Sequence, residues 1–252
     1  MSEQLAVDIS NYQGALGQDV FERWFAEGAR TVICGTDGSQ AYPVVFPSQV
    51  QRARAAGLEA EAYVYLYFAG DVVRRTNLKL DMIDGVGGIK RVWLDCEDTS
   101  SGLAPGEIVG LIAAARDAVQ SRGYQCGIYT GRWWWVPYAG DERGFYDLPL
   151  WLASYDGIWS LAMSPLGGWT ELHRKQFTDK GALGGVSPLD LNIERAPVLE
   201  AASPPEPAPT APSLEELLLT ARDTAFAAGK AHGWSAHVDA VDRQLAGLRQ
   251  PQ

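Results

Sequence analysis

Two acidic side chains, Asp95 and Glu97, stand two residues apart where the apolar run of residues 91–95 ends. The aromatic and β-branched content of this run predicts a strand, and side chains along a strand alternate between its two faces. Both carboxyls therefore point the same way, with about 6.6 Å between their α-carbons at about 3.3 Å per residue. This proximity suits glycoside hydrolysis, in which one carboxyl donates a proton to the leaving oxygen while the other stays ionised beside the anomeric carbon.

Two more acids lie at the ends of other predicted strands. Asp8 follows the apolar residues 5–7, and Asp190 follows residues 185–189 near the last predicted strand. A lone carboxylate at a strand end is commonly just solvated, but the parallel strands of a barrel bring their carboxyl ends to one mouth. We expect all four acids to meet at such a mouth.

Flat aromatic rings supply the second half of a sugar site, because the C–H faces of a pyranose pack against them. Tyr63 and Tyr65 share one face of a predicted strand, and Tyr129, Trp151 and Tyr155 lie at or just after the ends of later strands. Each ring alone could be a core residue, since aromatic side chains dominate protein cores. As a set beside the carboxyls they favour a carbohydrate groove, and we predict that these five residues bind substrate.

Composition excludes several other classes of function. The formal net charge is -10 and the Lys and Arg residues are scattered singly, so the basic clusters that bind nucleic acid are missing. The three histidines have no metal-binding spacing, the three cysteines resemble buried thiols, and no nucleotide-binding loop is present. No apolar stretch approaches the roughly 20 residues that span a bilayer, and residues 1–11 lack the features of a secretory signal. We therefore expect no metal, cofactor, nucleic-acid partner or membrane partner, and no signal peptide.

The elements that must position these residues alternate along residues 1–199. Helical patterns cover residues 20–25, 46–56 and 105–121. Strand-length apolar runs begin near residues 5, 31, 60, 91, 125, 149 and 172. Strand, helix and strand in repetition predict parallel pairing, and at least seven strands in about 200 residues suit a barrel. Because loops separate the later strands, we predict an α/β protein with a (β/α) TIM-like barrel whose outer helices are incomplete.

Six short blocks in this region stand in a characteristic order. They are residues 8–14, the Asp-x-Glu block 93–97, and residues 127–130, 150–155, 176–181 and 190–192. In order and spacing the blocks resemble the lysozymes of glycoside hydrolase family 25, which include the muramidases of phage endolysins and secreted bacterial or fungal enzymes. The resemblance spans roughly residues 5–194. It implies a (β/α)-type barrel that hydrolyses the β-1,4 bond between N-acetylmuramic acid and N-acetylglucosamine in bacterial peptidoglycan.

The resemblance also implies a role for each acid. By matching position, Glu97 would be the general acid, and Asp95 would stabilise the oxocarbenium ion or orient the N-acetyl group of the substrate as an internal nucleophile. Asp8 and Asp190 would bind substrate or tune the site electrostatically. Two segments depart from the family pattern: residues 36–42 lack the expected Lys and Glu, and Tyr63-Val-Tyr65 stands where the family often has a Tyr-His pair. Both departures concern the subsites that contact substrate.

The composition changes abruptly after the barrel region. Residues 200–212 are rich in Pro and Ala, which predicts an extended linker. Residues 213–252 carry apolar side chains at helical spacing and predict a small helical hairpin. A hairpin of this size cannot hold a core alone, so we expect it to target the cell wall or to join copies in a homo-oligomer. The predicted domains are a barrel at residues 1–199, a linker at 200–212 and a hairpin at 213–252.

These features favour a phage or prophage lytic enzyme that stays in the host cytoplasm until a holin releases it to the wall. Two alternatives remain open. One is a virion-associated enzyme that opens the wall locally, with the hairpin as an assembly element. The other is a non-catalytic wall-binding or tail-associated structural protein on the same barrel. The four acids argue against the second alternative, because a barrel that only binds glycan does not need closely paired carboxyls.

Overall fold

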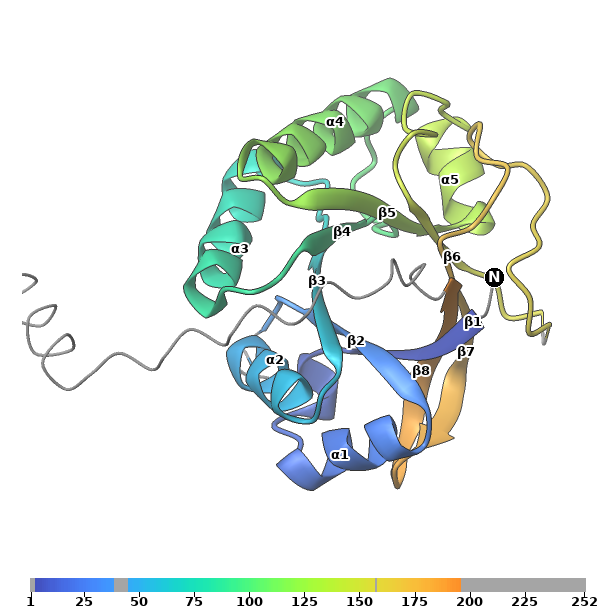
Figure 1. Cartoon of the computed structure of the whole chain (residues 1–252). Coiled ribbons are helices and arrows are strands. Elements are labelled where there is room, and N and C mark those ends of the chain that lie inside the picture. Colours follow the sequence, from blue (N-terminus) through green and yellow to red (C-terminus); the bar gives the residue numbers. More distant parts are fainter. Residues whose placement is uncertain (1–2, 39–44, 157, 196–252) are drawn as a thin grey trace, which may run out of the picture. The chain divides into compact units, whose positions relative to one another are not determined.

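The computed structural model describes residues 3–38, 45–156 and 158–195, which form a closed barrel of eight strands (Figure 1). The strands are β1 (Glu3–Ile9), β2 (Ala29–Gly35), β3 (Glu59–Tyr65), β4 (Arg91–Asp95), β5 (Gln125–Gly131), β6 (Leu150–Ala153), β7 (Arg174–Leu183) and β8 (Val186–Arg195). Each strand pairs with the next along the chain, and β8 closes the ring against β1. The predicted barrel is confirmed, whereas the predicted linker and helical hairpin lie outside the described residues.

Helices surround part of this ring of strands. They are α1 (Gln18–Ala26), α2 (Phe46–Ala55), α3 (Val72–Val86), α4 (Pro105–Ser121) and α5 (Arg132–Ala139), with a 3-10 turn η1 (Asn11–Gln13) after β1. Figure 1 shows them outside the strands on the side of β1 to β5, while the described residues between β6 and β7 contain no helix. The expectation of incomplete outer helices is therefore confirmed. No helix among the described residues is long and apolar enough to cross a bilayer.

Two expectations about the later strands were wrong. A loop was expected after β5, but α5 lies there; its three consecutive tryptophans and Pro137 are poor helix formers, and burial of Trp134 and Trp135 stabilises it instead. Parallel pairing was expected throughout, but β8 runs antiparallel to both β7 and β1. A tight turn at Gly184 and Gly185, both at positive φ, joins β7 to β8 and leaves no room for a helical crossover.

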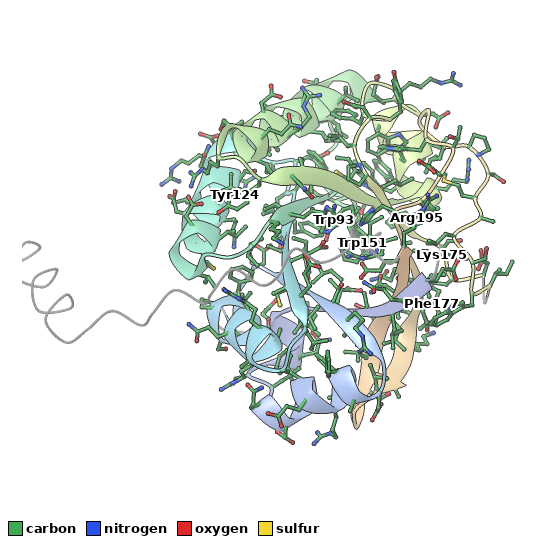
Figure 2. All side chains as sticks on the ribbon, in the orientation of Figure 1. Trp93, Tyr124, Trp151, Lys175, Phe177 and Arg195 are labelled. Carbon is green, nitrogen blue, oxygen red and sulfur yellow. The ribbon has the colours of Figure 1, made fainter. Side chains whose placement is uncertain are left out.

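The inside of the barrel is built in three levels by side chains that alternate along each strand. A middle level of apolar and aromatic side chains contains Trp93 and Trp151, whose ring centroids are 5.5 Å apart. Figure 2 shows these two residues within the ring of strands, whereas Tyr124 lies outside it. The carboxyl ends of β1 to β7 form the mouth above this level, and the opposite ends form the base. A Cβ at Gly127 would collide with the Trp93 ring, so glycine is required where β5 passes it.

A larger apolar core fills the space between the strands and the outer helices. It receives the alternate side chains of the strands, including Cys34, Cys96 and Cys126, all of which are buried free thiols as expected. Cys96 faces this core, so its neighbours Asp95 and Glu97 face the mouth. The alternation predicted for this segment is therefore confirmed, and it delivers both carboxyls to one cavity.

Candidate active site

The acidic pair lines a cavity of about 420 Å³ at the mouth of the barrel. Asp95 is the last residue of β4 and is only 5% exposed, while Glu97 lies just beyond the strand and is more open to solvent. Asp95 Oδ1 is buried and has no hydrogen-bond partner. An acid in this state is not part of the internal bonding of the fold, and it is free to interact with a molecule that enters the cavity.

Asp8 and Asp190 meet beside this pair. Asp8 on β1 and Asp190 on β8 are opposite each other in the strand register, and their carboxyls share a hydrogen bond. Asp190 lines the cavity, and Asp8 lies deeper, at 6% exposure. The prediction that four acids converge at one mouth is correct in its geometry.

Burial and mutual repulsion raise the pKa values of these acids. Burial, then the charges of Glu97 and Asp8, holds the pKa of Asp95 well above its usual range. Burial, then the charge of Asp8, raises the pKa of Glu97. Burial, then the charge and hydrogen bond of Asp8, raises the pKa of Asp190 to about 8. The ion pairs formed among the described residues include none of these acids. No ion pair therefore opposes the raised pKa values, and a raised carboxyl pKa is what a general acid requires.

Three predicted binding residues lie where a sugar could reach them. Tyr63 and Tyr65 line the cavity together with Tyr67, and the rings of Tyr65 and Tyr67 are 4.5 Å apart. Tyr155 is 54% exposed beyond β6. Tyr12, after β1, also lines the cavity and was missed by the sequence interpretation, because it belongs to a short turn rather than to a patterned strand.

The other two predicted binding residues are buried beneath the cavity. Tyr129 donates a hydrogen bond to Gln176 Oε1 at 2.8 Å, and the indole of Trp151 donates one to Asn192 Oδ1 at 2.7 Å. Their polar ends therefore contact protein groups, and their contact with substrate stays a prediction. Gln176 and Asn192 were not predicted as site residues. Alternation along β8 does place Asn192 on the same face as Asp190, and that signal could have identified it.

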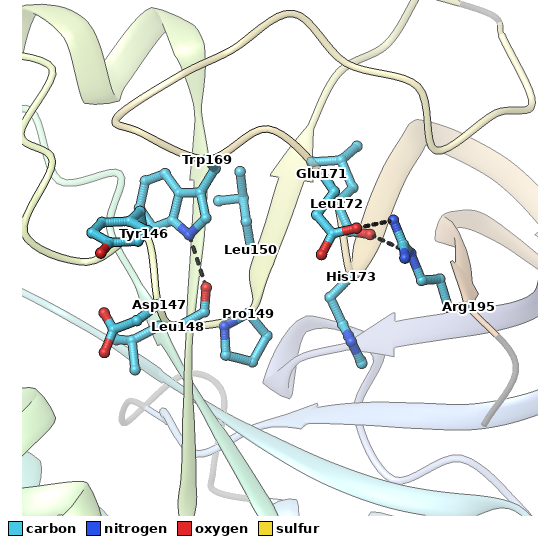
Figure 3. Close-up of a pocket in the computed structure, with 10 residues that line it drawn as sticks. All are labelled: Tyr146, Asp147, Leu148, Pro149, Leu150, Trp169, Glu171, Leu172, His173 and Arg195. Atoms are coloured by element: carbon cyan, nitrogen blue, oxygen red, sulfur yellow. Dashed lines mark hydrogen bonds and ion pairs between the residues drawn. The ribbon is translucent and has the colours of Figure 1, made fainter. Parts of the chain in front are cut away.

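A second pocket, of about 250 Å³, opens at the base of the barrel (Figure 3). Its polar groups are engaged with one another: Trp169 donates to Leu148 O at 2.8 Å, and Arg195 forms an ion pair with Glu171 at 2.9 Å. Burial and the charge of Arg91 lower the pKa of His173 to about 3, so this imidazole is neutral. Unlike the cavity at the mouth, this pocket is not lined by a buried acid that lacks a hydrogen-bond partner. We therefore place the candidate active site at the mouth.

No cluster of metal-binding side chains was found among residues 3–38, 45–156 and 158–195. The acids of the mouth can act as proton-transfer groups because burial and neighbouring charges raise their pKa values. Their pairing, with one buried carboxyl and one more accessible carboxyl in a single cavity, suits cleavage of a glycosidic bond.

Comparison with known proteins agrees with this chemistry. The family model "Glycosyl hydrolases family 25" matches residues 7–186. A "Probable GH family 25 lysozyme 2" of Dictyostelium discoideum is 31% identical over 153 residues, which cover 58% of this chain and 70% of that protein.

Solved structures agree as well. A family GH25 lysozyme from Aspergillus fumigatus matches with a TM-score of 0.65 at 25% identity, over 78% of this chain and 96% of that one. A muramidase from Trichobolus zukalii matches with a TM-score of 0.64 at 25% identity, over 77% and 95% of the two chains. The chain belongs to glycosyl hydrolase family 25, and it is a glycoside hydrolase with the barrel of the lysozymes.

Proposed function

We propose that this enzyme is a muramidase that hydrolyses the β-1,4 bond between N-acetylmuramic acid and N-acetylglucosamine in bacterial peptidoglycan. The observation that carries the proposal is the unpaired, buried Asp95 Oδ1 beside Glu97 in the cavity at the mouth. The names of the lysozyme and muramidase relatives support the substrate class. The tyrosines that line the cavity supply flat faces for pyranose rings.

In this proposal Glu97 is the general acid, because it is the more accessible member of the pair. Before substrate binds, burial favours a proton on Asp95. The acetamido N–H of a bound N-acetyl sugar would donate to Asp95 Oδ1, and a carboxylate that accepts such a bond is stabilised in its ionised form. Asp95 gives up its proton as it accepts this bond, Glu97 takes the proton up, and Glu97 then passes it to the leaving glycosidic oxygen. Asp95 either orients the N-acetyl group as an internal nucleophile or stabilises the oxocarbenium ion directly.

The proposal is tested with purified peptidoglycan and the Glu97→Gln variant. We expect wild-type protein to clear the suspension and release muropeptides with a new reducing end on N-acetylmuramic acid, identified by mass spectrometry. Loss of the general acid should lower the rate by roughly 10²- to 10⁴-fold. Equal clearing by both proteins would overturn the role of Glu97. Binding of walls without release of reducing ends would favour the non-catalytic alternative.

We further propose that the enzyme acts as a phage or prophage lysin. The support is the organisation of the sequence, in which a Pro/Ala-rich stretch at residues 200–212 separates the barrel from a segment with helical spacing. Expression of the full chain inside a susceptible bacterium should lyse the cells only when a holin is co-expressed. Lysis without the holin would contradict this role. Sedimentation analysis with and without walls would separate a wall-targeting segment from a homo-oligomeric or virion-assembly element.

A further inference from the structure

Beneath the cavity, two buried amide side chains contact Asp8. Asn192 Nδ2 donates to Asp8 Oδ2 at 2.7 Å, and Gln176 Nε2 donates to Asp8 Oδ1 and Oδ2 at 3.1 and 3.0 Å. Asn192 is fully buried and Gln176 is 3% exposed, so protein groups determine which end of each amide faces the acid.

The orientation of Asn192 follows from a group that can only donate. The indole N–H of Trp151 points at Asn192 Oδ1, at 2.7 Å, and indole nitrogen has no acceptor capacity. The amide oxygen of Asn192 must therefore face Trp151, which leaves its NH₂ group facing Asp8. The same strand carries Asn192 and Asp190 on one face, so this constraint acts directly beside the acid pair.

The amide oxygen of Gln176 faces two hydroxyl groups. Tyr129 and Tyr155 both donate to Gln176 Oε1, at 2.8 and 2.7 Å. With its oxygen satisfied twice, Gln176 also presents its NH₂ group to Asp8. Asp8 thus receives donors from two oriented amides, and an ionised carboxylate is the form that accepts them best.

We propose that Gln176 and Asn192 are positioning residues that hold Asp8 as a carboxylate, so that the proton shared between Asp8 and Asp190 resides on Asp190. Asp190 donates its O–H to Asp8, and no other change of bonding is needed. The ionised Asp8 is the charged group that, after burial, raises the pKa of Glu97. The two amides thereby act on the general acid through Asp8.

The charged surroundings agree with this location of the proton. The titratable groups that face the pair from other elements are Tyr63 on β3, Asp95 on β4, Glu97 beyond it, Tyr129 on β5, Tyr155 after β6, and Arg174 and Asp179 on β7. Arg174, at the base, favours the charge on Asp8, whereas Asp179 and Glu97 disfavour a charge on Asp190. Burial raises the pKa of Asp8 as well, but the two amide donors and Arg174 oppose that effect at Asp8, whereas the charges of Asp8, Asp179 and Glu97 add to it at Asp190.

The location of the proton can be measured without any activity. Carbon-13 labelling of aspartate carboxyls, with Asp8→Asn and Asp190→Asn for assignment, gives the titration of each acid by NMR. In the wild-type protein we expect Asp8 to be ionised at neutral pH and Asp190 to titrate near pH 8. In Gln176→Met, which removes the donors but keeps the side-chain volume, the titration of Asp8 should move to higher pH and that of Asp190 to lower pH.

The kinetic consequence rests on the proposed role of Glu97. The alkaline limb of kcat/KM against pH should move down by on the order of one pH unit in Gln176→Met. Trp151→Phe, which frees Asn192 to turn, should move it in the same direction. Trp169→Phe is the matched control: it also removes a buried indole donor, here to Leu148 O far from the mouth, and it should leave the limb in place.

Two results would overturn the inference. The first is that Asp8 carries the proton in the wild-type protein. The second is that Asp8 and Asp190 titrate in Gln176→Met and in Trp151→Phe as they do in the wild-type protein. If peptidoglycan is not hydrolysed at all, the proposed function fails while the NMR titration still decides the position of the proton. If Gln176→Met does not fold, the wild-type and Trp151→Phe titrations provide the test.

Discussion

Acidic side chains are buried at both ends of the same barrel, with opposite electrostatic results. At the mouth, Asp95 is 5% exposed and its pKa is raised, first by burial and then by neighbouring acids. At the base, Glu61 is 4% exposed; burial alone would raise its pKa, but the charges and hydrogen bonds of Arg174, with Arg91, hold it below the usual range. Equal burial thus produces opposite shifts, and the cations make the difference.

The contacts at the base show how complete this compensation is. Arg174 Nη1 contacts Glu61 Oε2 at 2.7 Å, and Arg174 Nε donates to Glu194 Oε2 at 2.7 Å. Trp93 donates to Glu61 Oε2 at 2.6 Å, and Gln4 donates to Glu194 Oε1 at 2.7 Å. At the base the buried acids are neutralised by cations and hydrogen bonds, whereas the mouth keeps reactive acids without such partners at a cost in stability.

The largest effect is expected from removing the cation of the base. Arg174→Met leaves the carboxylates of Glu61 and Glu194 buried without the guanidinium that neutralises them. Breaking a buried ion pair in this way costs about 3 to 5 kcal/mol of unfolding free energy. Urea denaturation at pH 7 measures the loss. Arg116→Met, which removes an exposed ion pair with Asp117, is the control and should cost less than about 1 kcal/mol. Similar losses in the two variants would contradict the distinction between base and mouth.

The opposite response is expected from an acid of the mouth. Because the folded protein raises the pKa of Asp95, its carboxylate destabilises the fold at neutral pH, and Asp95→Asn should increase the unfolding free energy. The same change should lower peptidoglycan hydrolysis by roughly 100-fold or more. Glu61→Gln is the matched variant at the base and should destabilise the protein. If Asp95→Asn lowered the unfolding free energy as Glu61→Gln is expected to do, the acids of the mouth and the base would not differ in their effect on stability.

A third effect concerns the pH dependence of stability. Asp190 has a folded pKa of about 8 and an ordinary unfolded value near 4, so the folded state binds the extra proton between these limits. Its contribution is fully present below about pH 4 and is lost as pH rises toward about 8. Asp190→Asn should therefore make the unfolding free energy fall less between pH 5 and pH 8. Glu61 has the reverse sign, since its lowered pKa makes its contribution vanish on acidification. Identical pH profiles for wild type and Asp190→Asn would contradict this assignment.

Sequence patterns predicted the parts of this arrangement that depend on local alternation. Asp95 and Glu97 are predicted to share one face because side chains alternate along a strand, and Asp8 is placed by its position after an apolar run. The direction of β8 was predicted wrongly as parallel, since an alternating pattern reads the same in both directions; the paired glycines before it were the available signal. The roles of Gln176 and Asn192 depend on donors that β5 and β6 bring across the barrel, and no local pattern encodes those contacts.

Strand β8 contributes to every level of the barrel interior. Its alternate residues Asp190, Asn192 and Glu194 lie in turn at the mouth, beneath it and at the base, where each bonds a different partner. One residue inserted or deleted between positions 190 and 194 would turn part of this series to the outer face. The spacing of these five positions therefore tolerates no insertion or deletion. The hairpin tip at Gly184 and Gly185 can change length without disturbing the hydrogen bonds of the mouth or of the base. Related chains that keep the same interior should vary in length at the tip and never within this segment.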